Sequence, residues 1–336
     1  MTIKIIRCLL AALLIIALLW LVPSEKVIAQ EEVPAEEAAP SVQVTAAAEP
    51  QAPAGQIVPI PIKKEIMAPI NEQYYTSDLS YADPSLKIEI TPGRAYDTDY
   101  LVARIKIADP SQLRSALHSK NGTDEANADR IAKHVNALLA INGDSFRINK
   151  PKDTRKYIIR QGENKFIQTW SGACYFDILM IDDQANFHVL PTPTRQEVDE
   201  FVANHTVVNS FCFGPALVID GQRQPQPADS LRANGVAWTR RAQRLALCQT
   251  GELEYMVVVT GGPDNPKCAG VTIEEFIDII YAEGTPIVAY NMDGGNSAWL
   301  VFRGAKQNTF GRAANQGKRP IADIIYFASA WQDAAE

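Results

Sequence analysis

A strand–helix–strand pattern in the last third of the sequence sets the tightest limit on the fold. The apolar run at 255–259 predicts a buried strand. Thr272 and Glu275 have the spacing of a capping box, and apolar residues then recur at helical spacing as far as Gly284. A second apolar run at 287–290 predicts another strand. Together these elements predict a βαβ unit, whose crossover we expect to be right-handed.

The turn after this second strand carries a candidate site. Asp293 follows the carboxyl end of the strand, which is where open α/β sheets bind ligands. Gly294 and Gly295 allow the backbone to turn sharply and to approach a ligand closely. Asn296 and Ser297 add hydrogen-bonding groups beside the carboxylate. Because Asp and Gly are also favoured turn residues, the spacing alone leaves a plain turn and a ligand site equally open.

The amino-terminal part of the chain differs from the rest in composition. Lys4 and Arg7 precede an uncharged apolar run at 8–22, whose length suits a signal-peptide core better than a membrane span. Small residues allow cleavage after Ala29, and an uncleaved signal anchor is the alternative. The residues that follow are rich in Ala, Glu and Pro, which predicts a disordered, extended linker. We therefore expect a signal peptide or signal anchor at 1–29, a linker at 30–69 and one folded domain at 70–336.

Charge and cysteine usage narrow the possible partners. The formal net charge is −7, and Lys and Arg form no run outside the first segment, so nucleic acid is not an expected partner. The first segment predicts a secreted or membrane-anchored protein whose domain is outside the cytoplasm and which meets a membrane only through that segment. Four cysteines follow it, with neither a disulfide framework nor a zinc pattern: Cys174, Cys212, Cys248 and Cys268. We expect buried thiols or at most two bridges.

A second polar strand end occurs earlier in the chain. The apolar run at 137–141 predicts a strand, and it ends in Asn142, Gly143 and Asp144. An Asn-Gly pair also favours a plain turn. If these residues form a site, strand ends that gather on one edge of a sheet would bring them to Asp293.

The remaining pattern indicates the fold class. Thr194 and Glu197 form another capping box, and the apolar run at 321–327 predicts a closing strand. Long helices that alternate with strands are too few for a doubly wound fold. We therefore predict an α+β fold, a single domain with a mixed β-sheet and flanking helices.

Residues 291–297, Asn-Met-Asp-Gly-Gly-Asn-Ser, resemble the N-L-D-G-G-G-S-S signature of the phosphodiester glycosidase family. This family contains uncovering-enzyme-like domains and bacterial exopolysaccharide-related proteins. Four weaker segments follow the family's order, and the resemblance covers about residues 130–330. They are 142–146 (family N-G-G-F-F), 213–215 (F-G-P), 244–248 (R-T-A-I-G) and 319–321 (R-x-V). The sequence departs from the family at Asn296, usually Gly, and at Ala298, often Ser.

The resemblance implies a hydrolase that cleaves sugar-1-phosphodiester linkages of cell-surface or extracellular glycans. Asp293 would be the base or nucleophile and Asp144 the partner carboxylate. Arg244 would hold the phosphate, because a guanidinium binds two oxygens at once, and Arg319 is the second candidate. Arg241 is an alternative to Arg244. Sugar hydroxyls or the phosphate would be oriented by Asn142, Asn296 and Ser297, and Gly294 and Gly295 could offer backbone N–H groups to an anion.

Two other functions remain open at this point. One is a metal-assisted phosphodiesterase that cuts at phosphorus, in which Asn142, Asp144 and Asp293 ligate a divalent cation through oxygen. The other is a non-catalytic glycan-binding or wall-assembly protein. We further expect Asn142, Asp144, Arg244 and Asp293 to converge on one pocket.

Overall fold

The computed structural model describes most of the chain after residue 53. The described residues are 54–120, 122–145, 157–167, 170–174, 177–225, 236, 238–263, 265–309 and 319–334. They all belong to the compact unit Pro53–Glu336. The predicted signal segment lies outside the described residues. Among those that are described, no helix has the length and apolar content that a membrane crossing requires.

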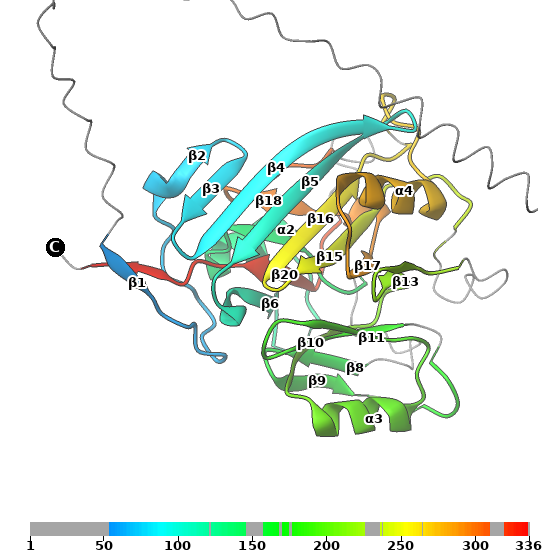
Figure 1. Cartoon of the computed structure of the whole chain (residues 1–336), viewed down its shortest axis with the longest axis horizontal. Helices are drawn as coiled ribbons and strands as arrows, with labels where there is room; N and C mark the ends of the chain where they lie inside the picture. Colours follow the sequence, from blue (N-terminus) through cyan, green and yellow to red (C-terminus); the bar gives the residue numbers. More distant parts are fainter. Residues whose placement is uncertain are drawn as a thin grey trace, which may run out of the picture. The chain divides into compact units, whose positions relative to one another are not determined.

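The described residues form one large, nine-stranded sheet (Figure 1). In spatial order its strands are β14 (Gln222–Arg223), β13 (Ala216–Ile219), β17 (Val288–Met292), β15 (Leu245–Gly251), β16 (Glu254–Thr260), β5 (Thr98–Ile107), β4 (Leu86–Ala95), β3 (Ser80–Asp83) and β2 (Tyr75–Ser77). The predicted helix between β16 and β17 is α4 (Ile273–Glu283), and the capping box of Thr272 and Glu275 is formed. This part of the prediction is confirmed.

The expectation of a mixed sheet is wrong for the described strands, because every pairing among them is antiparallel. The physical reason is the position of β15. It pairs with both β16 and β17, so these two strands run in the same direction without touching each other. Strand β15 therefore lies beside β16, at the position where the βαβ prediction placed β17.

A second sheet packs against the first and carries one strand of the candidate site. Within the described residues it has five strands: β19 (Ala305–Lys306), β18 (Leu300–Phe302), β7 (Leu139–Asn142), β20 (Asp323–Phe327) and β6 (Leu113–Leu117). Alternation along each strand explains the layers, since successive side chains point to opposite faces. Leu247 of the large sheet and Ile141 of the second share the main core, whereas their neighbours Ala246 and Ala140 face outward.

Helices cover the two outer faces. Phe276 and Ile280 of α4 pack on the outward residues of the large sheet. Ile131 and Val135 of α2 (Ala128–Val135) pack on those of the second sheet. The order is thus helix, sheet, sheet, helix, which confirms the α+β class. Short 3₁₀ helices are η1 (Glu72–Tyr74), η2 (Pro110–Gln112) and η4 (Gly295–Ser297).

A smaller part of the domain surrounds a separate core. It comprises β8 (Tyr157–Arg160), β9 (Glu163–Ile167), β10 (Ile178–Asp182), β11 (Phe187–Leu190), β12 (Val207–Phe211) and α3 (Arg195–Asn204). The capping box of Thr194 and Glu197 opens α3 as predicted. All four cysteines of the domain are buried, and Cys212, Cys248 and Cys268 form no disulfide bond among the described residues.

The start of the described chain is tied to its end. Strand β1 (Gly55–Ile57) pairs with β21 (Trp331–Asp333). The buried Arg114 then donates hydrogen bonds to the carbonyl oxygens of Pro61 (3.2 Å), Ile62 (3.1 Å) and Lys64 (2.8 Å). Residues 54–69 are therefore part of the folded unit, although their composition placed them in the linker. Their backbone is bound by a side chain fifty residues away, which local composition does not reveal.

We expect two truncations to differ in stability. Deletion of residues 1–52 should leave the free energy of unfolding unchanged, because all the described helices and strands lie after residue 53. Deletion of 1–69 should lower it by about 3 kcal/mol or more, because a buried guanidinium loses its carbonyl partners. Urea denaturation of both proteins measures the difference. Equal midpoints would show that this segment contributes nothing.

Candidate active site

The strand register explains how two distant charged residues meet. Strands β15 and β17 are antiparallel, and Leu245 pairs with Met292. The next residues outward are Arg244 on one strand and Asp293 on the other. By alternation, Arg244 lies on the same face as Ala246, which is the face covered by α4. The adjoining ends of these two strands therefore carry a guanidinium and a carboxylate on the same face of the sheet.

A cavity of about 270 Å³ opens at this edge. Its lining includes Asp293, Gly294, Arg240, Arg244 and Arg319. Arginines are therefore grouped around one acidic residue, in a space of the size that suits a small ligand. Among the predicted site residues that are described, Asn142, Asp144, Asn296 and Ser297 are not in the lining.

The surroundings of Arg244 disfavour its charged form. Its side chain is only 7% exposed, and it donates to the carbonyl oxygens of Val271 (3.3 Å) and Arg240 (2.7 Å). Burial, together with the positive charge of Arg240, lowers the pKa of Arg244 to about 10. Because both effects disfavour the guanidinium cation, a bound anion would relieve them. Arg241, the alternative to Arg244, instead pairs with Glu275.

Arg319 is held by the residues that follow the two glycines. Its Nη1 donates to the Ser297 hydroxyl at 3.1 Å, and its backbone N–H donates to the carbonyl of Asn296 at 3.4 Å. The indole of Trp299 donates to the Arg319 carbonyl at 3.1 Å. Ser297 is fully buried. In this structure Asn296 and Ser297 therefore position an arginine of the cavity.

The two glycines are explained by a close approach of backbones. A Cβ atom at Gly294 would collide with the carbonyl oxygen of Gln243. Gly295 has a positive φ of 55° and donates its N–H to the same oxygen at 2.9 Å. This bond occupies the Gly295 N–H, so the anion nest predicted from both glycines does not form as expected. The turn is instead fastened to the residue that precedes Arg244.

Asn142 connects the second sheet to the turn. Its Nδ2 donates to the backbone carbonyl of Asp293 at 2.9 Å, and its Oδ1 accepts the Trp299 N–H at 3.0 Å. The side chain is fully buried. Asn142 thus fixes the backbone of Asp293 from behind the cavity.

Asp144 lies in a buried ionic network. Its Oδ1 accepts the Cys212 N–H at 2.7 Å, and its Oδ2 accepts from Arg160 at 2.7 Å. Arg160 also pairs with Asp323 at 2.6 Å. The pKa of Asp323 is raised to about 6. Burial is the largest cause of the rise, Arg160 opposes it, and the charge of Asp144 adds to it. The expected convergence therefore holds for Arg244 and Asp293, while Asp144 belongs to this network.

Sequence reasoning missed Arg160, Asp323 and the cavity residue Arg240. The available signal was a charge at the end of, or inside, an apolar run: Arg160 follows Tyr157-Ile-Ile, and Asp323 lies within 321–327. A buried charge in such a run requires a charged partner. Gly143 belongs to the same arrangement, because a Cβ atom there would collide with the Asp323 carboxylate.

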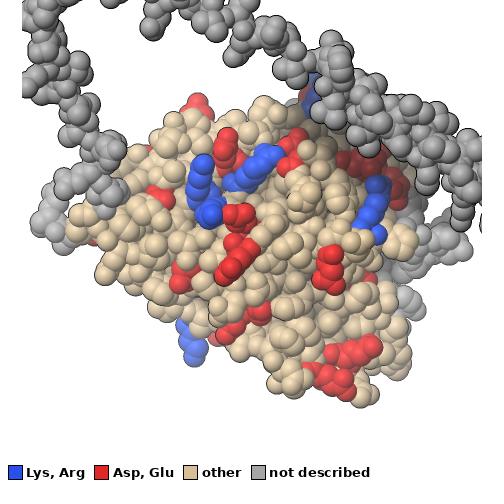
Figure 2. Space-filling view, in the orientation of Figure 1, with Lys and Arg blue, Asp and Glu red and all other residues tan. Residues whose placement is uncertain are grey.

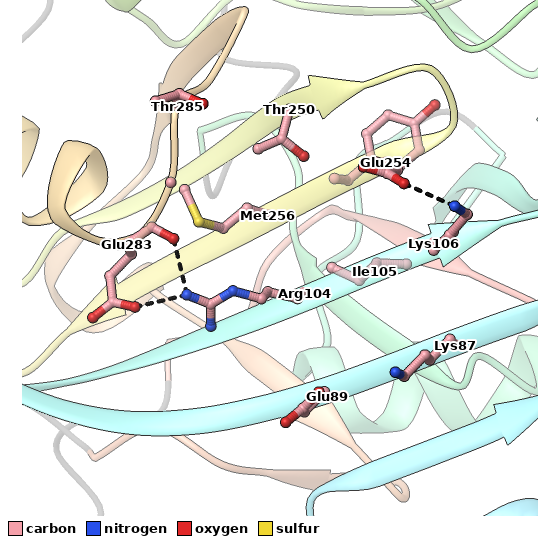
Figure 3. A pocket seen from close by; sticks show the side chains of 12 residues that line it. Lys87, Glu89, Arg104, Ile105, Lys106, Thr250, Glu254, Met256, Glu283 and Thr285 are labelled. Atoms are coloured by element: carbon pink, nitrogen blue, oxygen red, sulfur yellow. Dashed lines mark hydrogen bonds and ion pairs between the residues drawn. The ribbon is translucent and has the colours of Figure 1, made fainter. Parts of the chain in front are cut away.

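In the part of the chain that the structure describes, no group of three or more His, Cys, Asp or Glu residues could hold a metal ion. A larger hollow, of about 330 Å³, lies on the large sheet (Figure 3). Its lining has three basic and three acidic residues, among which Arg104 pairs with Glu283 at 2.8 Å and Lys106 with Glu254 at 2.9 Å. Figure 2 likewise shows acidic and basic side chains intermixed on the visible face. The larger hollow therefore lacks the excess of arginines found beside Asp293.

An acid beside grouped arginines, at the ends of β15 and β17, is an arrangement that can bind a phosphorylated ligand. The chain belongs to the phosphodiester glycosidase family, whose sequence model matches residues 135–328. This confirms the resemblance, and the family is one of hydrolases that act on phosphodiester-linked sugars. No curated protein matches the chain.

One solved structure shows the shared fold, and two others are similar at lower TM-scores. The catalytic domain of zebrafish N-acetylglucosamine-1-phosphodiester alpha-N-acetylglucosaminidase, auto-inhibited by its pro-peptide, has 16% identity and a TM-score of 0.58, covering 73% of this chain and 84% of that chain. A hypothetical protein from Synechocystis has 14% identity and a TM-score of 0.48, and the match covers 75% of this chain and 64% of that chain. A putative exported protein from Burkholderia pseudomallei has 15% identity and a TM-score of 0.42, and the match covers 68% of this chain and 74% of that chain.

Proposed function

We propose that this protein hydrolyses sugar-1-phosphodiesters by cleaving the bond between the anomeric carbon and the phosphate oxygen. The observation that carries the proposal is the cavity in which Asp293 lies with Arg240, Arg244 and Arg319. Burial lowers the pKa of Arg244 to about 10, so a bound anion would stabilise its charged form. Membership of the family supports the same chemistry.

Each group of the cavity has a role in this reaction. The arginines bind the phosphate oxygens and stabilise the phosphate monoester as it leaves. Asp293 activates a water molecule or attacks the anomeric carbon itself. Because a phosphate monoester is already a good leaving group, the reaction depends less on a general acid than ordinary glycoside hydrolysis does.

The role of Asp144 is proposed to be positioning. Both of its oxygens are bound, one by Arg160 and the other by the Cys212 N–H. Its backbone N–H is bound to Asp323 at 3.1 Å, so the network holds the turn that contains Asn142. Asn142 in turn holds Asp293. In this proposal Asp293 acts without a second carboxylate from Asp144.

We also propose that the reaction takes place outside the cytoplasm, on glycans of the cell surface or the medium. The support for this is the sequence of the first segment, with its basic residues and its apolar run at 8–22. The particular sugar and its phosphate partner follow the zebrafish relative only by analogy. N-acetylglucosamine 1-phosphodiesters are therefore the first substrates to test.

The test is hydrolysis of such a diester by the full chain in water enriched in ¹⁸O. The proposed reaction puts the label on the anomeric hydroxyl of the free sugar. Label in the phosphate, or release of a sugar 1-phosphate, would show attack at phosphorus. If a chelator then abolished this hydrolysis, the metal-assisted alternative would be favoured. Tight binding without turnover would favour a glycan-binding protein. Ordinary glycosides serve as the negative control.

A further inference from the structure

Two amide side chains in the same cavity have unusual surroundings. Gln243 and Asn291 both belong to its lining, and each is only 2% exposed. Among the described residues, Gln243 Oε1 and Asn291 Oδ1 are buried without a hydrogen-bond partner. A buried acceptor without a partner costs about 1–3 kcal/mol, so its retention at a cavity needs an explanation.

The orientation of both amides is fixed by their other end. The Nδ2 group of Asn291 donates to the carbonyl of Gly214 at 2.8 Å. The Nε2 group of Gln243 donates to the carbonyl of Thr309 at 3.0 Å. A carbonyl oxygen can only accept, so neither amide can be rotated to exchange its nitrogen for its oxygen. Each side chain therefore keeps its carbonyl oxygen, an acceptor, for a ligand, and its NH₂ group keeps one further N–H.

The backbone places these acceptors beside the charged residues. Gln243 lines the cavity together with Arg244, and its backbone carbonyl oxygen accepts the Gly295 N–H at 2.9 Å. Asn291 lies two residues before Asp293, and alternate positions along a strand share a face. The cavity thus combines two recognition chemistries: guanidinium donors for an anion, and neutral acceptors for groups that carry a hydrogen.

We infer that Gln243 and Asn291 form a hydroxyl-accepting subsite that selects the sugar of a glycosyl phosphate. The inference rests on the proposed function and adds to it the residues that recognise the sugar. Sugar hydroxyls supply the donors that the two oxygens need, while the arginines bind the phosphate of the same ligand. A second phosphate in place of the sugar would be repelled, because its oxygens are also acceptors. The subsite therefore discriminates glycosyl phosphates from pyrophosphates and simple phosphate esters.

The test compares the affinities of the full chain for glucose 1-phosphate and for inorganic phosphate by titration calorimetry. We expect the sugar phosphate to bind more tightly. Gln243→Met and Asn291→Leu should each weaken its binding roughly tenfold, the value of one hydrogen bond, and should leave the affinity for inorganic phosphate unchanged. Gln307→Met is the matched control, since its amide is also anchored to backbone carbonyls, at 2.9 and 3.1 Å, but lies outside the cavity lining.

Wild-type protein alone gives a second measurement if a variant fails to fold. Glucose 1-phosphates that lack single hydroxyl groups should show at least one position at which affinity falls roughly tenfold. The inference is overturned if glucose 1-phosphate binds no better than inorganic phosphate, if no deoxy analogue loses affinity, or if folded variants keep the full difference. These affinities do not require turnover. A chain that shows the expected differences but hydrolyses no diester would disprove the proposed reaction and keep the subsite.

Discussion

Replacement of Asp293 by asparagine is expected to abolish hydrolysis of a sugar-1-phosphodiester while the fold remains intact. The substitution preserves shape but removes the charge that activates water or attacks the sugar, which is worth about 10²–10⁴-fold for a general base. Stability should change little, because Asn142 binds the backbone carbonyl of Asp293 and this bond remains. Steady-state kinetics and thermal unfolding of the full chain measure the two effects separately.

A second Asp-Gly turn provides the control. Asp220 lies between β13 and β14, is exposed and has a positive φ of 50°, a conformation that asparagine also adopts readily. Asp220→Asn should therefore leave both activity and stability unchanged. If Asp293→Asn instead removes the folding transition, the carboxylate has a structural role and the assignment of Asp293 as the reactive group fails.

Replacement of Arg160 by leucine is expected to destabilise the domain strongly. The guanidinium is buried with two carboxylates, at 2.7 Å from Asp144 and 2.6 Å from Asp323. Its removal leaves two uncompensated buried charges, which costs about 3–5 kcal/mol. Arg94→Leu is the control: Arg94 and its partner Asp99 are about half exposed, so loss of their pair should change the stability little. Urea denaturation of both variants at pH 7.5 gives the comparison.

The same network predicts a direction for the pH dependence. The pKa of Asp323 is raised in the folded state to about 6, so the folded chain binds more protons than the unfolded chain between about pH 4 and pH 6. Its contribution to stability is therefore complete at low pH and is lost as the pH rises through 6. The penalty of Arg160→Leu should accordingly shrink as the pH falls from 7.5 to 5. A penalty that grows on acidification would contradict this account of the network.

The local elements could be predicted from the sequence because their signals are short. Capping boxes at Thr194 and Thr272 mark the starts of α3 and α4, and the apolar run at 287–290 marks β17. The position of Asp293 directly after that strand follows from the same pattern. Each of these features depends on residues within a few positions of one another.

The arrangement between elements could not be predicted in the same way. Nothing in the apolar runs shows that β15 lies between β16 and β17, since both parallel and antiparallel strands can be uninterrupted apolar runs. The role of Asp144 was missed because its partners come from separate strands, Arg160 from β8 and Asp323 indirectly from β20. Ser297 was expected to face a ligand, but its hydroxyl is bound by Arg319, a residue outside the motif. Such pairings are properties of the tertiary structure.

The pairing of β1 with β21 determines how the domain responds to mechanical force. The ladder joins the point where the described chain begins to the point where it ends, and the Ala334 N–H binds the Ala54 carbonyl at 2.9 Å. Tension applied between these two ends is borne first by this short ladder and then by the carbonyl contacts of Arg114. Because Arg114 belongs to β6, the force would reach the five-stranded sheet through these contacts, and we expect the outer ladder to open before the strands that hold Asp293 and Arg244 separate.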